Sequence, residues 1–178
     1  MSAQPDRLAR WRPRSLRARQ LWAASLGLVA FVILTGYVLD RAFMDVASQG
    51  LRERMQAYAY AYAGGVDFAR DGTLIPPDVP PDSRFEQPGS GLYAMVRLDN
   101  GRWQSASAQG PQLPDGPMLA GLEEEFSGPL PMVRTDGAAG EVYRFGLGLV
   151  WAGEDDPQAE FPYTIYVMED AKIGRAHV

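Results

Sequence analysis

A run of nineteen residues without a charged side chain, from Leu21 to Leu39, constrains this 178-residue chain more than any other feature. Ten of the nineteen are Leu, Ile, Val or Phe. As a helix the run would rise about 30 Å, which matches the hydrocarbon core of a bilayer. Each such residue favours insertion by roughly 0.3 to 0.6 kcal/mol, enough to outweigh the few polar and glycine positions. The sequence therefore predicts a transmembrane helix over residues 21–40.

The stretch before this run is basic and predicts the orientation of the chain. Residues 1–20 contain six arginines against one aspartate. Because Lys and Arg accumulate on the cytoplasmic side, we expect residues 1–20 to be a cytoplasmic tail and the region after Asp40 to lie outside. A cleaved signal peptide is the alternative, but its apolar core spans only about 7 to 15 residues. The nearest site of small residues, around Val46–Ser48, lies well past this longer run, which favours an uncleaved anchor.

The composition beyond the apolar run favours the bacterial envelope. The chain contains no cysteine, so an exported domain would be stabilised by packing and not by disulfide bonds. Beyond Leu39 there are 11 basic and 21 acidic residues. This balance argues against nucleic acid as a partner and favours cations that bridge an acidic surface to membrane lipids. We expect the bacterial inner (plasma) membrane as the location, with the bulk of the chain in the periplasm.

The last seven residues, KIGRAHV, match the translation of a common sequencing-library adapter. We therefore expect residues 172–178 to be an artefact and the natural protein to continue past Ala171. This removes His177, the only histidine, from the candidate catalytic and metal-binding residues. Without the tail, the outer region has 9 basic and 21 acidic side chains. Residues 41–171 then have the length of one domain with a single core.

The segment after the apolar run has helical periodicity. From Arg41 to Ala63, apolar side chains recur at steps of three or four residues, at Phe43, Ala47, Leu51, Met55, Tyr58 and Tyr62. This spacing places them on one helical face. Because no proline separates this segment from the apolar run, we expect one long helix that leaves the membrane and ends at Gly64 and Gly65.

Five later segments have the alternating, aromatic and β-branched character of strands. The clearest are residues 92–98 and 102–107, which flank an Asn-Gly turn signal and predict a β-hairpin. The remaining segments are predicted as strands at 131–135, 141–151 and 161–169, loops at 72–91 and 111–117, and a short helix at 118–126. The predicted fold is α+β, with the long helix packed on an antiparallel sheet of about five strands.

The side chains that could carry chemistry are carboxylates. The chain lacks cysteine and a Gly-x-Ser-x-Gly motif, so we expect no catalytic residues and no bound organic cofactor. Carboxylate-only sites suit Mg²⁺ or Ca²⁺. The candidate metal ligands lie in the loop before the last strand, and they are Glu154, Asp155, Asp156 and Glu160. A solvated acidic turn is the alternative interpretation, as it is for Glu123–Glu125, whose side chains would diverge on a helix.

The strand segments resemble a known family. In order, PGSGLYAMVRLDNGRWQSAS, GPQLP, EVYRFGLGLVW and FPYTIYVMED are similar to the periplasmic sensor region of proteobacterial two-component sensor histidine kinases of the PhoQ type. The similarity extends over residues 10–171. It implies a PAS-like (PDC) periplasmic sensor domain at residues 41–171 between two transmembrane helices. It also implies a HAMP relay, a dimerisation helix with the phosphorylated histidine and an ATP-binding kinase domain, none of which lies within residues 1–178.

The resemblance implies partners and a mechanism. The intact parent would be a homodimeric protein histidine kinase that phosphorylates a cytoplasmic response regulator. In magnesium-responsive members, an acidic stretch before the final strand faces the membrane, and Glu154, Asp155, Asp156 and Glu160 occupy the similar place here. Divalent cations would neutralise the repulsion between this face and anionic lipid, and their loss would shift the population of docked states.

Two other functions are open from the sequence. The same sensor could control a different output, such as a cyclase or a chemoreceptor. The chain could also be a free-standing anchored envelope protein that binds a partner. The DNA beyond codon 171 discriminates among the three, because a second apolar run followed by a kinase domain would be present only in a sensor histidine kinase.

Overall fold

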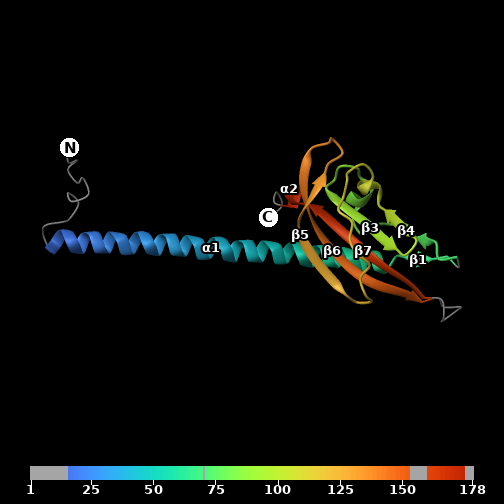
Figure 1. Cartoon of the computed structure of the whole chain (residues 1–178), viewed down its shortest axis with the longest axis horizontal. Helices are drawn as coiled ribbons and strands as arrows, with labels where there is room; N and C mark the ends of the chain where they lie inside the picture. Colours follow the sequence, from blue (N-terminus) through green and yellow to red (C-terminus); the bar gives the residue numbers. More distant parts are fainter. Residues whose placement is uncertain (1–15, 70, 153–159, 175–178) are drawn as a thin grey trace, which may run out of the picture. The chain divides into compact units, whose positions relative to one another are not determined.

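The computed structural model describes residues 16–69, 71–152 and 160–174 (Figure 1). The chain divides into two units, Met1–Val46 and Ala47–Val178. One helix, α1 (Leu16–Ala63), contributes residues to both units. The described residues form an α+β fold with one long N-terminal helix and a five-stranded antiparallel sheet, which confirms the predicted class.

Within the first unit, α1 carries the predicted transmembrane segment. Its apolar side chains are exposed, and Leu21, Phe31 and Leu39 each retain about two thirds of their accessible surface, at 69%, 66% and 64%. By length and composition this helix could cross a membrane, and a signal sequence near the N-terminus would have the same character. So large an exposed apolar surface indicates a lipid or protein partner.

Within the second unit, the last turns of α1 pack on the sheet through an apolar stripe. Met55, Ala59 and Tyr62 are at most 1% exposed. The Ala-Tyr tract that ends the helix is helical, as predicted, because its period of three and four residues matches this buried face. The helix closes where the amide of Gly64 donates to the carbonyl of Tyr60 at 3.0 Å.

The sheet confirms the prediction of about five antiparallel strands. Its members are β3 (Leu92–Leu98), β4 (Gly101–Gln104), β5 (Glu124–Val133), β6 (Ala139–Ala152) and β7 (Glu160–Asp170). The order is β4-β3-β7-β6-β5, so the last strand in sequence lies at the centre. There Ile165 is the partner of Val96 on one side and of Leu147 on the other. A short 3-10 helix, η2 (Ser83–Glu86), and a two-stranded ladder of β1 (Asp67–Phe68) and β2 (Leu74–Ile75) precede this sheet.

Several boundaries differ from the prediction. The strand predicted at 131–135 begins at Glu124 and ends at Val133, and the predicted loop at 72–91 contains β2 and η2. The second hairpin strand ends at Gln104, where a 3-10 helix, η3 (Ala106–Ala108), begins. The predicted short helix at 118–126 is wrong, because the end of this segment is the start of β5. Phe126 pairs with Phe145 of β6, and this cross-strand packing overrides the local preference for a helix.

Alternate residues along the strands build a core on each face of the sheet. The first face contacts α1, and in Figure 1 the teal end of the helix lies against the strands. The second face is covered by the connection from β4 to β5, which we call the crossing segment (residues 105–123). Its Leu119 amide donates to the Thr164 hydroxyl of β7 at 2.9 Å, and its Pro117 carbonyl accepts from the Tyr166 hydroxyl.

Candidate functional site between helix and sheet

The predicted metal ligands are only partly within the described residues. Glu154, Asp155 and Asp156 lie outside them. Glu160 is the exposed first residue of β7, opposite Ala152 of β6. Within residues 16–69, 71–152 and 160–174, no group of three or more His, Asp or Glu side chains is arranged to hold a metal ion. The acidic-loop site therefore stays a prediction.

The second acidic cluster, Glu123–Glu125, does not converge on a single point. The Glu123 carboxylate accepts a hydrogen bond from the Ala120 amide at 2.9 Å. Glu124 and Glu125 are successive residues of β5, paired with Leu147 and Gly146 of β6, so their side chains face opposite sides of the sheet. Each carboxylate has its own protein partner, which is the arrangement of structural contacts and not of a shared cation site.

The polar groups that the structure brings together lie along α1, on both sides of its buried stripe. Arg54 and Tyr58 are four residues apart on one side, and Gln56 and Tyr60 are four residues apart on the other. The first pair reaches the end of β7 and the loop before β3, and the second pair reaches β5. These contacts connect the helix to three separate parts of the sheet domain.

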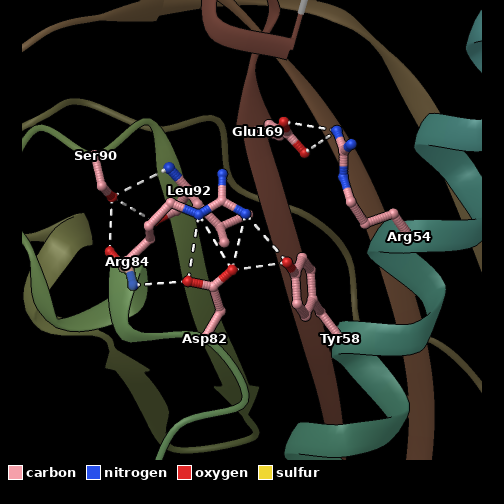
Figure 2. Close-up of polar contacts among 7 residues, drawn as sticks. All are labelled: Arg54, Tyr58, Asp82, Arg84, Ser90, Leu92 and Glu169. Carbon is pink, nitrogen blue, oxygen red and sulfur yellow. Dashed lines mark hydrogen bonds and ion pairs between the residues drawn. The ribbon is translucent and has the colours of Figure 1, made fainter. Parts of the chain in front are cut away.

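The contact between Arg54 and Glu169 joins residues 115 positions apart in the sequence (Figure 2). The guanidinium Nη2 donates to both carboxylate oxygens, at 2.8 and 2.9 Å. Glu169 is 1% exposed, whereas the Arg54 side chain is 36% exposed. A carboxylate buried this deeply requires a cationic partner, so the position of β7 depends on Arg54.

Tyr58 makes the next contact, with an ion pair from the loop before β3 (Figure 2). Its hydroxyl donates to Asp82 Oδ2 at 2.8 Å and accepts from Arg84 Nη2 at 3.1 Å. Asp82 also caps the 3-10 helix η2, because its Oδ1 accepts from the Arg84 amide at 2.9 Å. The hydrogen bonds from Arg84 hold the pKa of Asp82 well below its usual range. Burial, the largest cause, raises the pKa of Tyr58, so its hydroxyl stays protonated at neutral pH and donates a hydrogen bond to Asp82.

The loop that carries this ion pair is fixed against α1 by aromatic and backbone contacts. The ring of Phe85 packs edge-on against Tyr58 and Tyr62, with centroids 5.5 and 4.9 Å away. The hydroxyl of Ser90 donates to the Arg84 carbonyl at 2.7 Å. The loop before β3, the helix and the start of β3 therefore form one packed assembly.

On the other side of the stripe, Glu124 at the start of β5 accepts two hydrogen bonds from α1. The donors are the Gln56 amide at 2.8 Å and the Tyr60 hydroxyl at 3.0 Å. Arg52 is a further, weaker partner at 3.8 Å. Because these groups are more exposed than Glu169, this contact contributes less to stability than the pair of Arg54 and Glu169.

The sequence did not single out Arg54, Asp82, Arg84 or Glu169, and it identified Tyr58 only as a packing residue of the helical face. One signal was available: Glu169 ends a strand of apolar residues, and Arg54 directly precedes the buried Met55. A charge that interrupts an apolar face requires a partner. The sequence does not show that these two charges are partners of one another.

Comparisons with known proteins identify no relative of this chain. No protein-family model matches it. Searches of curated proteins and of solved structures also give no match.

Proposed function

We propose that this chain is the membrane-anchored, periplasmic sensing region of a receptor, of the kind found at the N-terminus of PhoQ-like two-component sensor histidine kinases. The observation that carries the proposal is the continuity of α1. The same helix, Leu16–Ala63, contains the apolar run of residues 21–39 and the stripe of Met55, Ala59 and Tyr62 in the domain core. Because the stripe and the apolar run belong to one helix, a movement of the sheet domain that displaces the stripe would also displace the helix that carries the apolar run.

The charge distribution supports the proposed orientation. Six arginines precede the apolar run, whereas residues 40–171 carry 9 basic and 21 acidic side chains. The basic end belongs on the cytoplasmic side. The acidic domain would then face the anionic surface of the membrane from the periplasm, where divalent cations can reduce the repulsion.

The contacts of the last strand support a role in signalling. Glu169 at the end of β7 is held by Arg54 near the point where α1 enters the domain. An α+β domain with a long helix on one face of a five-stranded antiparallel sheet is also the architecture that the PAS-like resemblance implies. In the proposed mechanism, cation binding at the acidic loop before β7 changes the balance between two positions of β7 and α1.

The orientation can be tested with single cysteines, because the chain has none of its own. Ala138→Cys places a thiol in the exposed turn between β5 and β6, and Ala3→Cys places one in the basic tail. In intact spheroplasts, a membrane-impermeant maleimide should label the first variant and label the second only after permeabilisation. Labelling in the opposite order, or release of a shortened Ala138→Cys protein into the periplasm, would contradict the anchored orientation.

The sensing function can be tested in a chimera that joins residues 1–171 to the relay and kinase domains of a characterised sensor histidine kinase. Kinase activity should change between micromolar and millimolar Mg²⁺. The double variant Asp155→Asn with Asp156→Asn should abolish the response, whereas Asp99→Asn, which removes one exposed charge in the β3–β4 turn, should leave it. An unchanged response in the double variant would exclude the acidic loop. A chimera that folds but responds to no divalent cation would exclude cation sensing.

A further inference from the structure

The second face of the sheet, away from α1, carries a cluster of arginines that the proposed function does not use. Arg97 of β3 and Arg102 of β4 are cross-strand partners, and Arg144 lies on β6. All three belong to the face of Met95 and Val142, since side chains alternate along each strand. Each of the three arginines comes from a different strand of the sheet.

The crossing segment supplies a counter-charge to only part of this cluster. Asp115 binds Arg102 through its carboxylate at 2.8 Å and accepts a hydrogen bond from Arg144 through its backbone carbonyl. Asp115 makes both contacts, one from its side chain and one from its backbone, and two residues later the Pro117 carbonyl accepts a hydrogen bond from the Tyr166 hydroxyl of β7, which lies between β3 and β6. Arg144 has a second partner in Glu125, at 2.9 Å, and lies over the Tyr166 ring at 5.1 Å.

Arg97 is the unsatisfied member. No hydrogen bond or ion pair joins its side chain to the part of the chain that the structure describes, and its Nε is buried without a partner there. The Nε of Arg144, a residue that is 7% exposed, is also buried and unpartnered. Like charges directly opposite on neighbouring strands repel, and a buried guanidinium N–H without an acceptor is unfavourable. A ligand with several acceptor oxygens would relieve both effects.

We infer that Arg97 and Arg102, with Arg144 beside them, form a binding site for a small oxyanion on the second face of the sheet, which Asp115 occupies in the free protein. The guanidinium group is planar and donates two parallel hydrogen bonds, so it fits a carboxylate or a phosphate. Binding displaces the Asp115 carboxylate from Arg102. The ligand therefore competes with the crossing segment for the same donors.

The proposed anion site shares no residue with the proposed cation site, so it can be tested apart from cation sensing. The full chain in an uncharged detergent is titrated with inorganic phosphate or with malonate, and heat and thermal unfolding are measured at constant ionic strength set with sodium chloride. Wild type should bind at least one of these two anions and unfold at a higher temperature in its presence. A response to one alone identifies the phosphate or the carboxylate class. No binding of either at 10 mM would overturn the inference.

Three variants make the test specific. Arg97→Gln should weaken binding by about tenfold or more, which corresponds to the loss of one charge-assisted contact. It should unfold at an equal or higher temperature without anion, because the repulsion with Arg102 is gone. Asp115→Asn should bind more tightly, since the competing carboxylate is removed.

Arg52→Gln is the control, because it also removes one positive charge but lies on α1, and it should bind like wild type. Unchanged binding in Arg97→Gln, or equal weakening in Arg52→Gln, would overturn the proposal.

Discussion

The guanidinium of Arg54 lies 2.8 and 2.9 Å from the two carboxylate oxygens of Glu169, and it joins the helix that enters the sheet domain to the last strand of the sheet. Glu169 is almost fully buried, so its charge is stabilised mainly by this partner. The two residues come from opposite ends of the domain sequence. Their contact fixes the end of β7 next to α1.

Loss of this partner should be costly. Arg54→Met leaves a buried carboxylate without a cation, which typically destabilises a protein by about 3–5 kcal/mol. Urea unfolding of the full chain in detergent, followed by circular dichroism, measures the change. Arg52→Met is the matched control, because Arg52 is half exposed and 3.8 Å from Glu124, and it should cost less than about 1 kcal/mol. Equal losses in the two variants would contradict the role of Glu169. The double variant Arg54→Met with Glu169→Met should recover much of the loss.

Asp82 should make stability depend on acid pH. Its pKa in the folded protein is depressed, chiefly by hydrogen bonds from Arg84. A depressed pKa contributes stability that is present above the unfolded value of about 4 and is lost as the pH falls toward the folded value. Asp82→Asn should therefore be less stable at neutral pH and should lose less stability below pH 4 than wild type does. If the free energies of unfolding of wild type and Asp82→Asn fell in parallel below pH 4, this prediction would be contradicted.

Tyr166 should make the stability of the protein depend on alkaline pH. Burial raises its pKa to about 12. Since the raised pKa belongs to the folded state, the stability it contributes is complete below the unfolded value near 10 and is lost as the pH rises through 12. The difference in ultraviolet absorption between wild type and Tyr166→Phe should show the titration of one tyrosine near pH 12. Titration of every tyrosine near pH 10 would be inconsistent with its burial.

Gly148 should not tolerate a side chain. A Cβ there would overlap the carbonyl oxygen of Ala120 and would lie 2.8 Å from Leu119 Cβ. Gly148→Ala should therefore displace the crossing segment and destabilise the domain by about 1–3 kcal/mol. Gly101→Ala is the control, because its Cβ would meet no atom within 4 Å, and it should change the free energy of unfolding little. Equal stability of the two variants in urea would show that the crossing segment is loosely held.

The parts of the fold that follow from short-range sequence could be predicted. The hairpin of β3 and β4 was predicted from Asn100 and Gly101 between two alternating segments, and the structure makes the turn at Asp99 and Asn100, with Gly101 as the first residue of β4. The helix was predicted from an apolar period that continues to Tyr62. The segment at 118–126 could not be predicted in this way. Its conformation depends on Leu119 packing over Gly148 and on Phe126 pairing with Phe145, and these contacts involve residues distant in sequence.

The same distinction applies to the candidate site. The carboxylates of one short stretch, Glu123–Glu125, were recognised as a cluster from the sequence. In the structure their side chains bind different partners. Arg54 and Glu169 were not recognised, because a pairing across most of the domain leaves no local pattern. The arginine cluster on the second face likewise exists only once β3, β4 and β6 lie in the same sheet.

The central position of β7 has a consequence for how the protein is made. The two hairpins β3–β4 and β5–β6 leave the ribosome before β7, and each then presents an open edge that only β7 can join. Until the final strand is made these edges stay unpaired, and a chain that stops before Glu160 would present both to neighbouring molecules. Pairing of residues 160–170 thus removes both open edges in one step, and shortened products should be more sensitive to proteases than the full chain.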